Sequence, residues 1–286
     1  MINDVRLREA VTLPPDVRLE ALLHLSEEGL NPDDRAQLAL ALVDLIAEPA
    51  LSAKQRMALG EALGQLGDPR LQTPKEDGYW VRVHLDDDRQ LDVGRYPVTT
   101  AEWLAFVESD RYNDAALWDA AGIAWRDGDR PSWRSLAAAP DSAHLIIPNQ
   151  PAVGVSWYEA MAYARAHGSR LLEYDERVLL MRGTEKRPYP WGQPFGQGNA
   201  NTREEVLGKP SAVGVFFRDQ TPEGIFDLAG NVGEWTADVV GELRVIHPGS
   251  WEQPSMAAWA KALHIISPAA RAADLGFRLA RGVVEG

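Results

Sequence analysis

The chain has 286 residues, of which 45% are hydrophobic and 25% are charged, enough for one large domain and a smaller one around a substantial core. Its formal net charge of −13 argues against a nucleic-acid phosphate groove or an anionic membrane as main partner, because both require a basic surface. The absence of cysteine excludes disulfides, thiolate metal sites and cysteine nucleophiles. Neither a signal peptide nor a run of about 18 apolar residues is present, which predicts a cytoplasmic protein without membrane insertion.

Residues 1–72 are predicted to form about three short helices, each bounded by residues that start or stop a helix. The first ends at Gly29, and the second begins at Asn31, an N-cap that is followed by proline. The third begins at Ser52, whose capping box is completed three residues later, and it ends at Gly67. This helical segment is interpreted either as an appendage that packs on the main domain or as an element that docks a partner.

Residues 78–286 follow a different pattern of short alternating strands that is rich in tryptophan and glycine. Residues 80–84 and 90–93 alternate as the two strands of a hairpin, with an acidic turn at residues 86–88 between them. Ser156 is expected to cap a helix, because a glutamate three residues later completes its capping box. This part of the chain is therefore predicted to mix strands with helices.

Several motifs in this domain occur in an order and spacing that resemble one known family. They are YPVTTAEWLAFV at residues 96–107, PNQPAVGVSWYEA at 148–160, DLAGNVGEWTAD at 227–238 and LGFR at 275–278. Together they resemble the formylglycine-generating-enzyme (sulfatase-modifying-factor) family, whose fold is C-type lectin-like. The resemblance implies an α+β, C-type lectin-like domain over residues 78–286, with short twisted antiparallel strands, two or more helices and long loops, preceded by a small α-helical segment.

Residues 110–149 fit the family poorly and are predicted to form a loop insert. The insert contains three large aromatic residues, Trp118, Trp125 and Trp133. Two interpretations stay open, because long inserts in compact domains commonly serve interactions, whereas tryptophans also serve to fix a loop to a core.

The resemblance implies copper chemistry for which this chain lacks the residues. Formylglycine-generating enzymes hold copper with a pair of cysteine thiolates, and the chain has no cysteine. The related sulfoxide synthases place iron on histidines, but the chain's six histidines show no metal-ligand spacing. Neither a Gly-x-Ser-x-Gly elbow nor a distinctive pair of carboxylates is present. We therefore expect no catalytic residues, no metal site and no enzymatic activity.

Hard oxygen donors occur at Asn199, Asn201, Asp227 and Asn231, in loops where the resemblance implies that family members can hold calcium. The chain lacks the dense acidic spacing of a loop that binds calcium by itself. These residues are therefore expected to form structural hydrogen bonds and the protein to need no cofactor, with structural calcium as the alternative.

The segment at residues 244–278 keeps a fixed frame, Gly249-Ser-Trp251 and Gly276-Phe-Arg278, around unusual contents. Family members carry polar residues between these points, whereas this chain carries apolar ones such as Met256 and Trp259. Such side chains are costly to expose without a purpose, and tryptophan is the commonest hot spot of interfaces. The frame stands at the end of the chain, and in this respect the chain resembles the variable proteins of diversity-generating retroelements, which rewrite this segment on a C-type lectin-like scaffold.

The predicted function is non-enzymatic binding of a macromolecular ligand, expected to be a protein, by a diversified surface within residues 244–278. Alternative hypotheses are an inert scaffold, a metal-dependent oxidase of the formylglycine-generating type and an interaction module of a bacterial signalling system. A phage particle is an alternative location. Arg271 and Arg278 are expected to be framework residues that bond loop carbonyls. The residues expected on the ligand-binding face are His247, Glu252, Gln253, Pro254, Trp259, Lys261, His264, Ile265, Ile266, Ala270, Ala272, Ala273 and Asp274.

Overall fold

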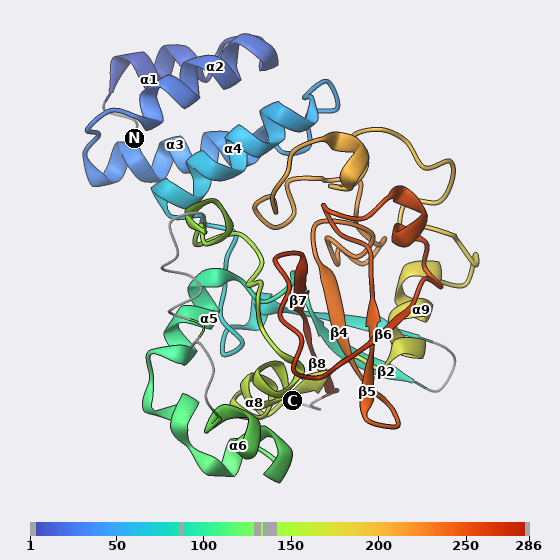
Figure 1. The fold of residues 1–286 in the computed structure, drawn as a ribbon. Coiled ribbons are helices and arrows are strands. Elements are labelled where there is room, and N and C mark those ends of the chain that lie inside the picture. Colours follow the sequence, from blue (N-terminus) through green and yellow to red (C-terminus); the bar gives the residue numbers. More distant parts are fainter. Residues whose placement is uncertain (1–3, 86–88, 129–132, 134–141, 284–286) are drawn as a thin grey trace.

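The computed structural model describes residues 4–85, 89–128, 133 and 142–283 (Figure 1). The predicted acidic turn at residues 86–88 and much of the second half of the predicted insert lie outside these residues. Within the described part of the chain, no helix is both long enough and apolar enough to cross a membrane.

Four helices precede the domain in the described part of the chain: α1 (Val5–Ala10), α2 (Pro15–Ser26), α3 (Pro32–Asp44) and α4 (Ala53–Leu66). The expectation of about three helices missed α1, because its six residues bury only Leu7 and Ala10 and leave little periodic signal. The expected caps of the later helices are confirmed. Asn31 caps α3, and Ser52 forms a capping box with Gln55 at the start of α4.

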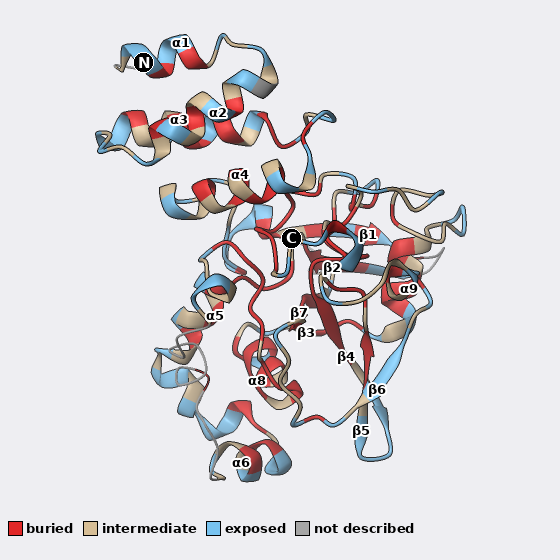
Figure 2. Ribbon diagram, turned by 45° about the horizontal axis from the view of Figure 1, so that its top comes forward, coloured by how far each residue is buried: buried red, intermediate tan, exposed pale blue. Residues whose placement is uncertain are grey.

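Helix α4 joins the helical segment to the domain (Figures 1 and 2). Its Gly60 approaches Ala212 so closely that a Cβ on the glycine would lie 2.7 Å from the alanine Cβ. Asn149 donates from Nδ2 to the carbonyl of Gly60 at 2.9 Å. The buried Arg56 donates to the carbonyl of Val215 at 3.1 Å. One apolar cluster therefore runs from α2 and α3 through α4 into the domain.

Two four-stranded sheets form the centre of the described domain. The first holds β1 (Trp80–His84), β2 (Gln90–Gly94), β8 (Leu279–Gly282) and β3 (Arg170–Leu171) in that order, with antiparallel pairs. The second holds β6 (His264–Ile266), β5 (Leu243–His247), β4 (Gly233–Val240) and β7 (Leu275–Phe277). Its pairs are antiparallel except that of β4 with β7, which is parallel. Strands β6 and β7 are thus the edges of the second sheet.

Helices and short helical turns surround the two sheets (Figure 1). They are α5 (Thr100–Val107), α6 (Ala120–Arg126), α8 (Trp157–Ala166) and α9 (Tyr174–Arg182), with the 3-10 helices η1 (Asp77–Tyr79), η2 (Asp110–Asn113), η3 (Ala115–Leu117), η4 (Ala143–Leu145), η5 (Arg203–Glu205) and η6 (Ser255–Ala258). The expected capping box at Ser156 is confirmed. An aromatic core joins α5, α8 and β7, because the rings of Trp103, Tyr163 and Phe277 lie with centroids 5.4 to 5.9 Å apart.

The described part of the predicted insert is packed against the domain. The side chains of Trp118, Trp125 and Trp133 are all buried. The ring of Trp125 packs on that of Tyr158 in α8 with centroids 5.7 Å apart, and the indole of Trp133 donates to the carbonyl of Val153 at 2.8 Å. These contacts favour the interpretation in which the tryptophans fix the insert to the core.

Candidate functional site

Arg278, in the C-terminal frame, lies in a buried ionic network. Its guanidinium pairs with Glu234 of β4 at 2.9 Å, Glu234 also pairs with Arg177 of α9 at 3.1 Å, and all three side chains are 1% exposed. Burial alone would raise the pKa of Glu234, but the charges of Arg278 and Arg177 outweigh burial and hold that pKa below its usual value. Arg278 also donates to the carbonyls of Gly94 and Phe226, as expected of a framework residue.

At both glycines of the frame, the backbone of another segment approaches so closely that there is no room for a side chain. A Cβ on Gly249 would overlap the carbonyl of Ala229. A Cβ on Gly276 would lie 2.7 Å from the carbonyl oxygen of Ala152. The frame is therefore fixed by steric contacts as well as by the ionic network, on both sides of the loop that it encloses.

The prediction that His247 lies on a ligand-binding face is wrong, because this side chain is 0% exposed. Its Nε2 lies 3.0 Å from the carbonyl oxygen of Trp259, and its Nδ1 accepts from the amide of Gly249 at 3.3 Å. Burial, followed by the charge of Arg177, holds the pKa of His247 well below its usual value. The neutral imidazole therefore acts as a tie between β5 and the loop that follows it.

Four further residues from the expected face are not free surface positions. Ile266, Ala270 and Ala272 are partly buried against the aromatic core. Asp274 is half-buried, and its carboxylate accepts a hydrogen bond from the Ser250 hydroxyl at 2.7 Å. These residues therefore belong structurally with the frame.

The other residues of the expected face lie at or near the surface. Trp259 is 46% exposed and Ile265 is 36% exposed. The loop before β6 adds two large apolar side chains, Met256 at 77% and Leu263 at 50% exposure. Of the remaining residues, Glu252, Lys261, His264 and Ala273 are exposed, and Gln253 and Pro254 are half-buried.

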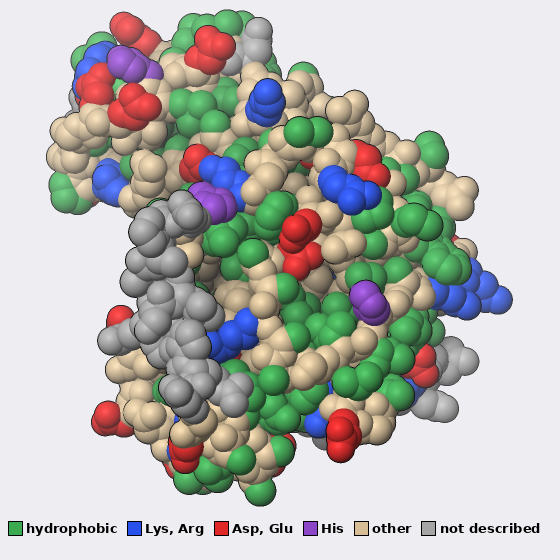
Figure 3. Space-filling view, viewed as in Figure 1, with side chains coloured by type: hydrophobic (Ala, Val, Ile, Leu, Met, Phe, Trp, Pro, Cys, Tyr) green, Lys and Arg blue, Asp and Glu red, His purple; other side chains and the backbone are tan. Residues whose placement is uncertain are grey.

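A second apolar area, which sequence reasoning missed, lies on the hairpin of β4 and β5. Val240 pairs with Leu243, and both side chains are exposed. Val245, two residues after Leu243, pairs with Ile265, so Val240, Leu243 and Ile265 share one face of the sheet. Figure 3 shows hydrophobic side chains gathered over β5 and β6. We call the exposed apolar residues Val240, Leu243, Met256, Trp259, Leu263 and Ile265 the display surface.

Residues of the display surface should matter less for stability than those of the frame. The double variant Trp259→Ser/Leu263→Ser is expected to lower the free energy of unfolding by about 1–2 kcal/mol, since the two side chains are 46% and 50% exposed and bury only part of their apolar area. Phe277→Ala, which removes a fully buried ring, is expected to cost about 3–5 kcal/mol. Urea denaturation followed by circular dichroism measures both. A loss of several kcal/mol in the double variant would contradict a free surface at these positions.

Two buried carboxylates, Asp219 and Asp227, lie beside the frame. Burial, followed by the charge of Asp219, raises the pKa of Asp227 to about 7, although its carboxylate accepts from the amide of Gly214 at 2.7 Å. Burial also raises the pKa of Asp219 to about 6, against hydrogen bonds from the amides of Ala229 and Gly230. At neutral pH the ionised form of Asp227 therefore opposes folding.

Stability is expected to respond to pH through Asp227. Its folded pKa is raised, so its contribution to stability is present at low pH and is lost as the pH rises through about 7. Lowering the pH from 8 to 6 should therefore stabilise the wild type by about 1 kcal/mol more than Asp227→Asn. Asparagine also tolerates the positive φ of 57° at this position. Urea titrations at both pH values test this, and identical pH responses of the two proteins would contradict it.

The expectation of structural hydrogen bonds is confirmed at two of the candidate calcium loops. Asn201 donates to the carbonyl of Lys209 at 3.1 Å, and the Asn231 side chain accepts from the amide of Ser211 at 2.9 Å. Within the described residues, no three histidine, aspartate or glutamate side chains lie together in a group that could hold a metal ion. Structural calcium at these asparagines stays a prediction.

Two sheets with short strands, flanking helices and long loops define an α+β domain of the C-type lectin-like fold. The solved structure of PvdO from Pseudomonas aeruginosa has this fold in common with the chain, with a TM-score of 0.52 and 24% identity over 68% of this chain and 81% of that one. Residues 76–283 match the sulfatase-modifying factor enzyme 1-like domain. The chain belongs to this family.

Curated relatives include proteins that are named as enzymes. The hercynine oxygenase of Mycolicibacterium thermoresistibile is 27% identical over 225 residues, which cover 62% of this chain and 49% of that protein. The formylglycine-generating enzyme of Streptomyces coelicolor is 28% identical over 231 residues, which cover 67% of this chain and 73% of that protein. The chain spans about half the length of the hercynine oxygenases that it matches.

Proposed function

We propose that this protein is a non-catalytic binding protein whose display surface contacts a macromolecular ligand, another protein. The contrast between frame and loop carries this proposal. Arg278 and Phe277 are buried and fixed, whereas Met256, Trp259 and Leu263 are exposed between the two halves of the frame. Large apolar side chains that are exposed together are typical of interaction surfaces, and tryptophan contributes strongly to binding energy.

The support for a diversified surface comes from how the loop is held. Backbone contacts fix the positions of Gly249 and Gly276, and the ionic network fixes Arg278. The side chains of the display surface that lie between them are exposed. Exchange of those side chains leaves the supporting contacts in place. We therefore infer that the exposed positions within residues 252–274 are the variable positions of a cassette of the kind that diversity-generating retroelements rewrite.

The coding locus tests the cassette. We expect a near-copy of the DNA that encodes Arg244 to Arg278, differing almost only at adenines, beside a gene for a reverse transcriptase. A complete locus with neither element would contradict the cassette.

Binding itself is tested at the protein level with the double variant Trp259→Ser/Leu263→Ser as a matched control. A ligand captured by the wild type and lost by this variant supports the display surface as the binding site. Equal capture by both proteins would mean that the ligand binds outside the display surface.

The names of the relatives favour metal-dependent oxidation as a second candidate function. The chain has no cysteine to hold copper, so such a protein would need other ligands. Metal analysis of protein purified from cells supplied with copper and iron distinguishes the candidates. Stoichiometric copper or iron would favour the oxidase, and metal below stoichiometry favours the binding protein.

A further inference from the structure

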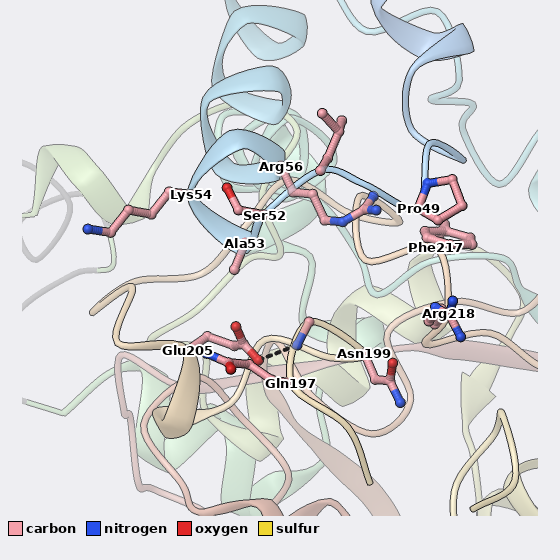
Figure 4. A pocket seen from close by; sticks show the side chains of 12 residues that line it. Pro49, Ser52, Ala53, Lys54, Arg56, Gln197, Asn199, Glu205, Phe217 and Arg218 are labelled. Atoms are coloured by element: carbon pink, nitrogen blue, oxygen red, sulfur yellow. Dashed lines mark hydrogen bonds between the residues drawn. The ribbon is translucent and has the colours of Figure 1, made fainter. Parts of the chain in front are cut away.

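A cavity of about 560 Å³ lies between the start of α4 and the C-type lectin-like domain (Figure 4). The helical side contributes Leu51, Lys54 and Arg56. The domain side contributes Glu205, together with Phe217 and the neighbouring Arg218. Both the helical segment and the domain are therefore needed to form this space, which lies in the size range of small-molecule sites.

Glu205 forms a negative end of the cavity. The residue is 7% exposed, and one carboxylate oxygen accepts from the amide of Gly198 at 2.5 Å. Figure 4 shows the other oxygen pointing into the space below Ala53. Burial, and to a smaller extent the charge of Glu204, raises the pKa of Glu205 against the hydrogen bond from the Gly198 amide. Within the described residues, no cationic side chain forms an ion pair with Glu205. A buried carboxylate without a cationic partner is unfavourable, and a ligand that carries an amino group would relieve this cost.

Arg218 forms a positive end on the opposite side of the cavity in Figure 4. Its guanidinium lies 5.5 Å from the centroid of the Phe217 ring, and the guanidinium of Arg56 lies 4.7 Å from the same centroid. Burial, followed by the charge of Arg218, lowers the pKa of Arg56, so the two guanidinium groups repel one another. Within the described residues neither forms an ion pair with a carboxylate, and the guanidinium of Arg56 is occupied by carbonyl groups, among them that of Ile46 at 2.7 Å.

We propose that this cavity binds a small zwitterion whose amino group pairs with Glu205 and whose acidic group pairs with Arg218. The Leu51 side chain and the Phe217 ring also line the cavity and suit a methylene chain between the two charged groups. Lys54 lines the cavity too, but its side chain points away from the middle (Figure 4). The two charged ends recognise a charge separation, which excludes simple anions and simple amines as good ligands.

The cavity shares no lining residue with the display surface, and ligand binding there would give the helical segment a role. Because Leu51 and Arg56 come from that segment, a ligand in the cavity binds only the docked arrangement. Binding therefore stabilises the docking of α4 by mass action. Protection of α4 amides from hydrogen exchange is expected to rise when the ligand is added.

The test uses ω-amino acids of increasing length as probes, namely 4-aminobutyrate, 6-aminohexanoate and 8-aminooctanoate, with the matching carboxylates and amines as controls. Calorimetry on the full chain at low salt measures their affinities. At least one amino acid is expected to bind about tenfold or more tightly than both of its single-charge controls. The proposal is overturned if none of the three amino acids exceeds its controls.

Three variants assign the two ends. Arg218→Gln is expected to lower the affinity of the best amino acid about tenfold and to leave that of the matching amine unchanged. Glu205→Gln, which keeps an oxygen for the Gly198 amide, is expected to act in the opposite sense. Lys75→Gln is the control, because Lys75 is exposed and does not line the cavity, and it should change neither affinity. Arg218 is exposed, so its variant is expected to fold, and an affinity unaffected by Arg218→Gln would by itself overturn the proposal.

Discussion

Glu234→Gln is expected to lower the free energy of unfolding by about 3–5 kcal/mol, because it leaves two buried guanidinium groups without their shared counter-charge. Arg177 and Arg278 both pair with this carboxylate, and all three side chains are 1% exposed. Glutamine has nearly the volume of glutamate, so the loss reports missing charge and not a cavity. Urea denaturation and thermal melting of the purified variant measure the effect.

The control for this prediction is an ion pair at the surface. Glu28 pairs with Arg6 where their side chains are 33% and 55% exposed, so Glu28→Gln should leave the unfolding transition in place. Comparable, small shifts in both variants would contradict a stabilising role for the buried network. Loss of soluble Glu234→Gln protein, with normal yields of Glu28→Gln, would agree with the prediction.

Gly64→Ala is expected to destabilise the helical segment by about 2 kcal/mol, although alanine has a helix propensity about 1 kcal/mol better than glycine. A Cβ at this position would lie 2.5 Å from the Oδ1 of Asn149 and 2.8 Å from a methyl group of Ile147. The Asn149 side chain cannot swing away, because its Nδ2 donates to the carbonyl of Gly60 at 2.9 Å and to Asp68 at 3.0 Å.

Hydrogen exchange across α4, together with urea denaturation, measures the effect of Gly64→Ala. Faster exchange in α4 is expected, with unchanged exchange in the second sheet. Gly29→Ala is the matched control, since a Cβ there meets nothing within 4 Å. A stabilised Gly64→Ala protein would mean that α4 does not pack closely on the domain.

Local features were predictable because they depend on residues near one another in the chain. The capping boxes at Ser52 and Ser156 each need a partner three residues away, and both are present in the structure. Helix α1 escaped prediction since its only strong signal is the cap by Asp4. The family motifs could also be recognised in the sequence, and the family resemblance that they support implied the C-type lectin-like fold.

The candidate site was predictable only in part. Trp259, Lys261, His264 and Ile265 are exposed, but His247, which the same reasoning placed among them, is buried. The difference arises because the carbonyl oxygen of Trp259 lies 3.0 Å from Nε2 of His247. No motif or spacing in the sequence predicts this contact. The apolar hairpin around Val240 was missed for a related reason, since exposure depends on what other segments cover.

The sequence by itself determined the family, the frame of glycines and Arg278, the helix caps and the lack of cysteine chemistry. Only the tertiary structure decided which side chains the frame buries and which it displays. The guanidinium of Arg278 donates a hydrogen bond to the carbonyl of Gly94, 184 residues away in the sequence, and that of Arg56 donates to the carbonyl of Val215, 159 residues away. Burial and charge pairing are properties of such distant neighbours, so the ionic network, the display surface and the zwitterion cavity exist only once the chain has folded.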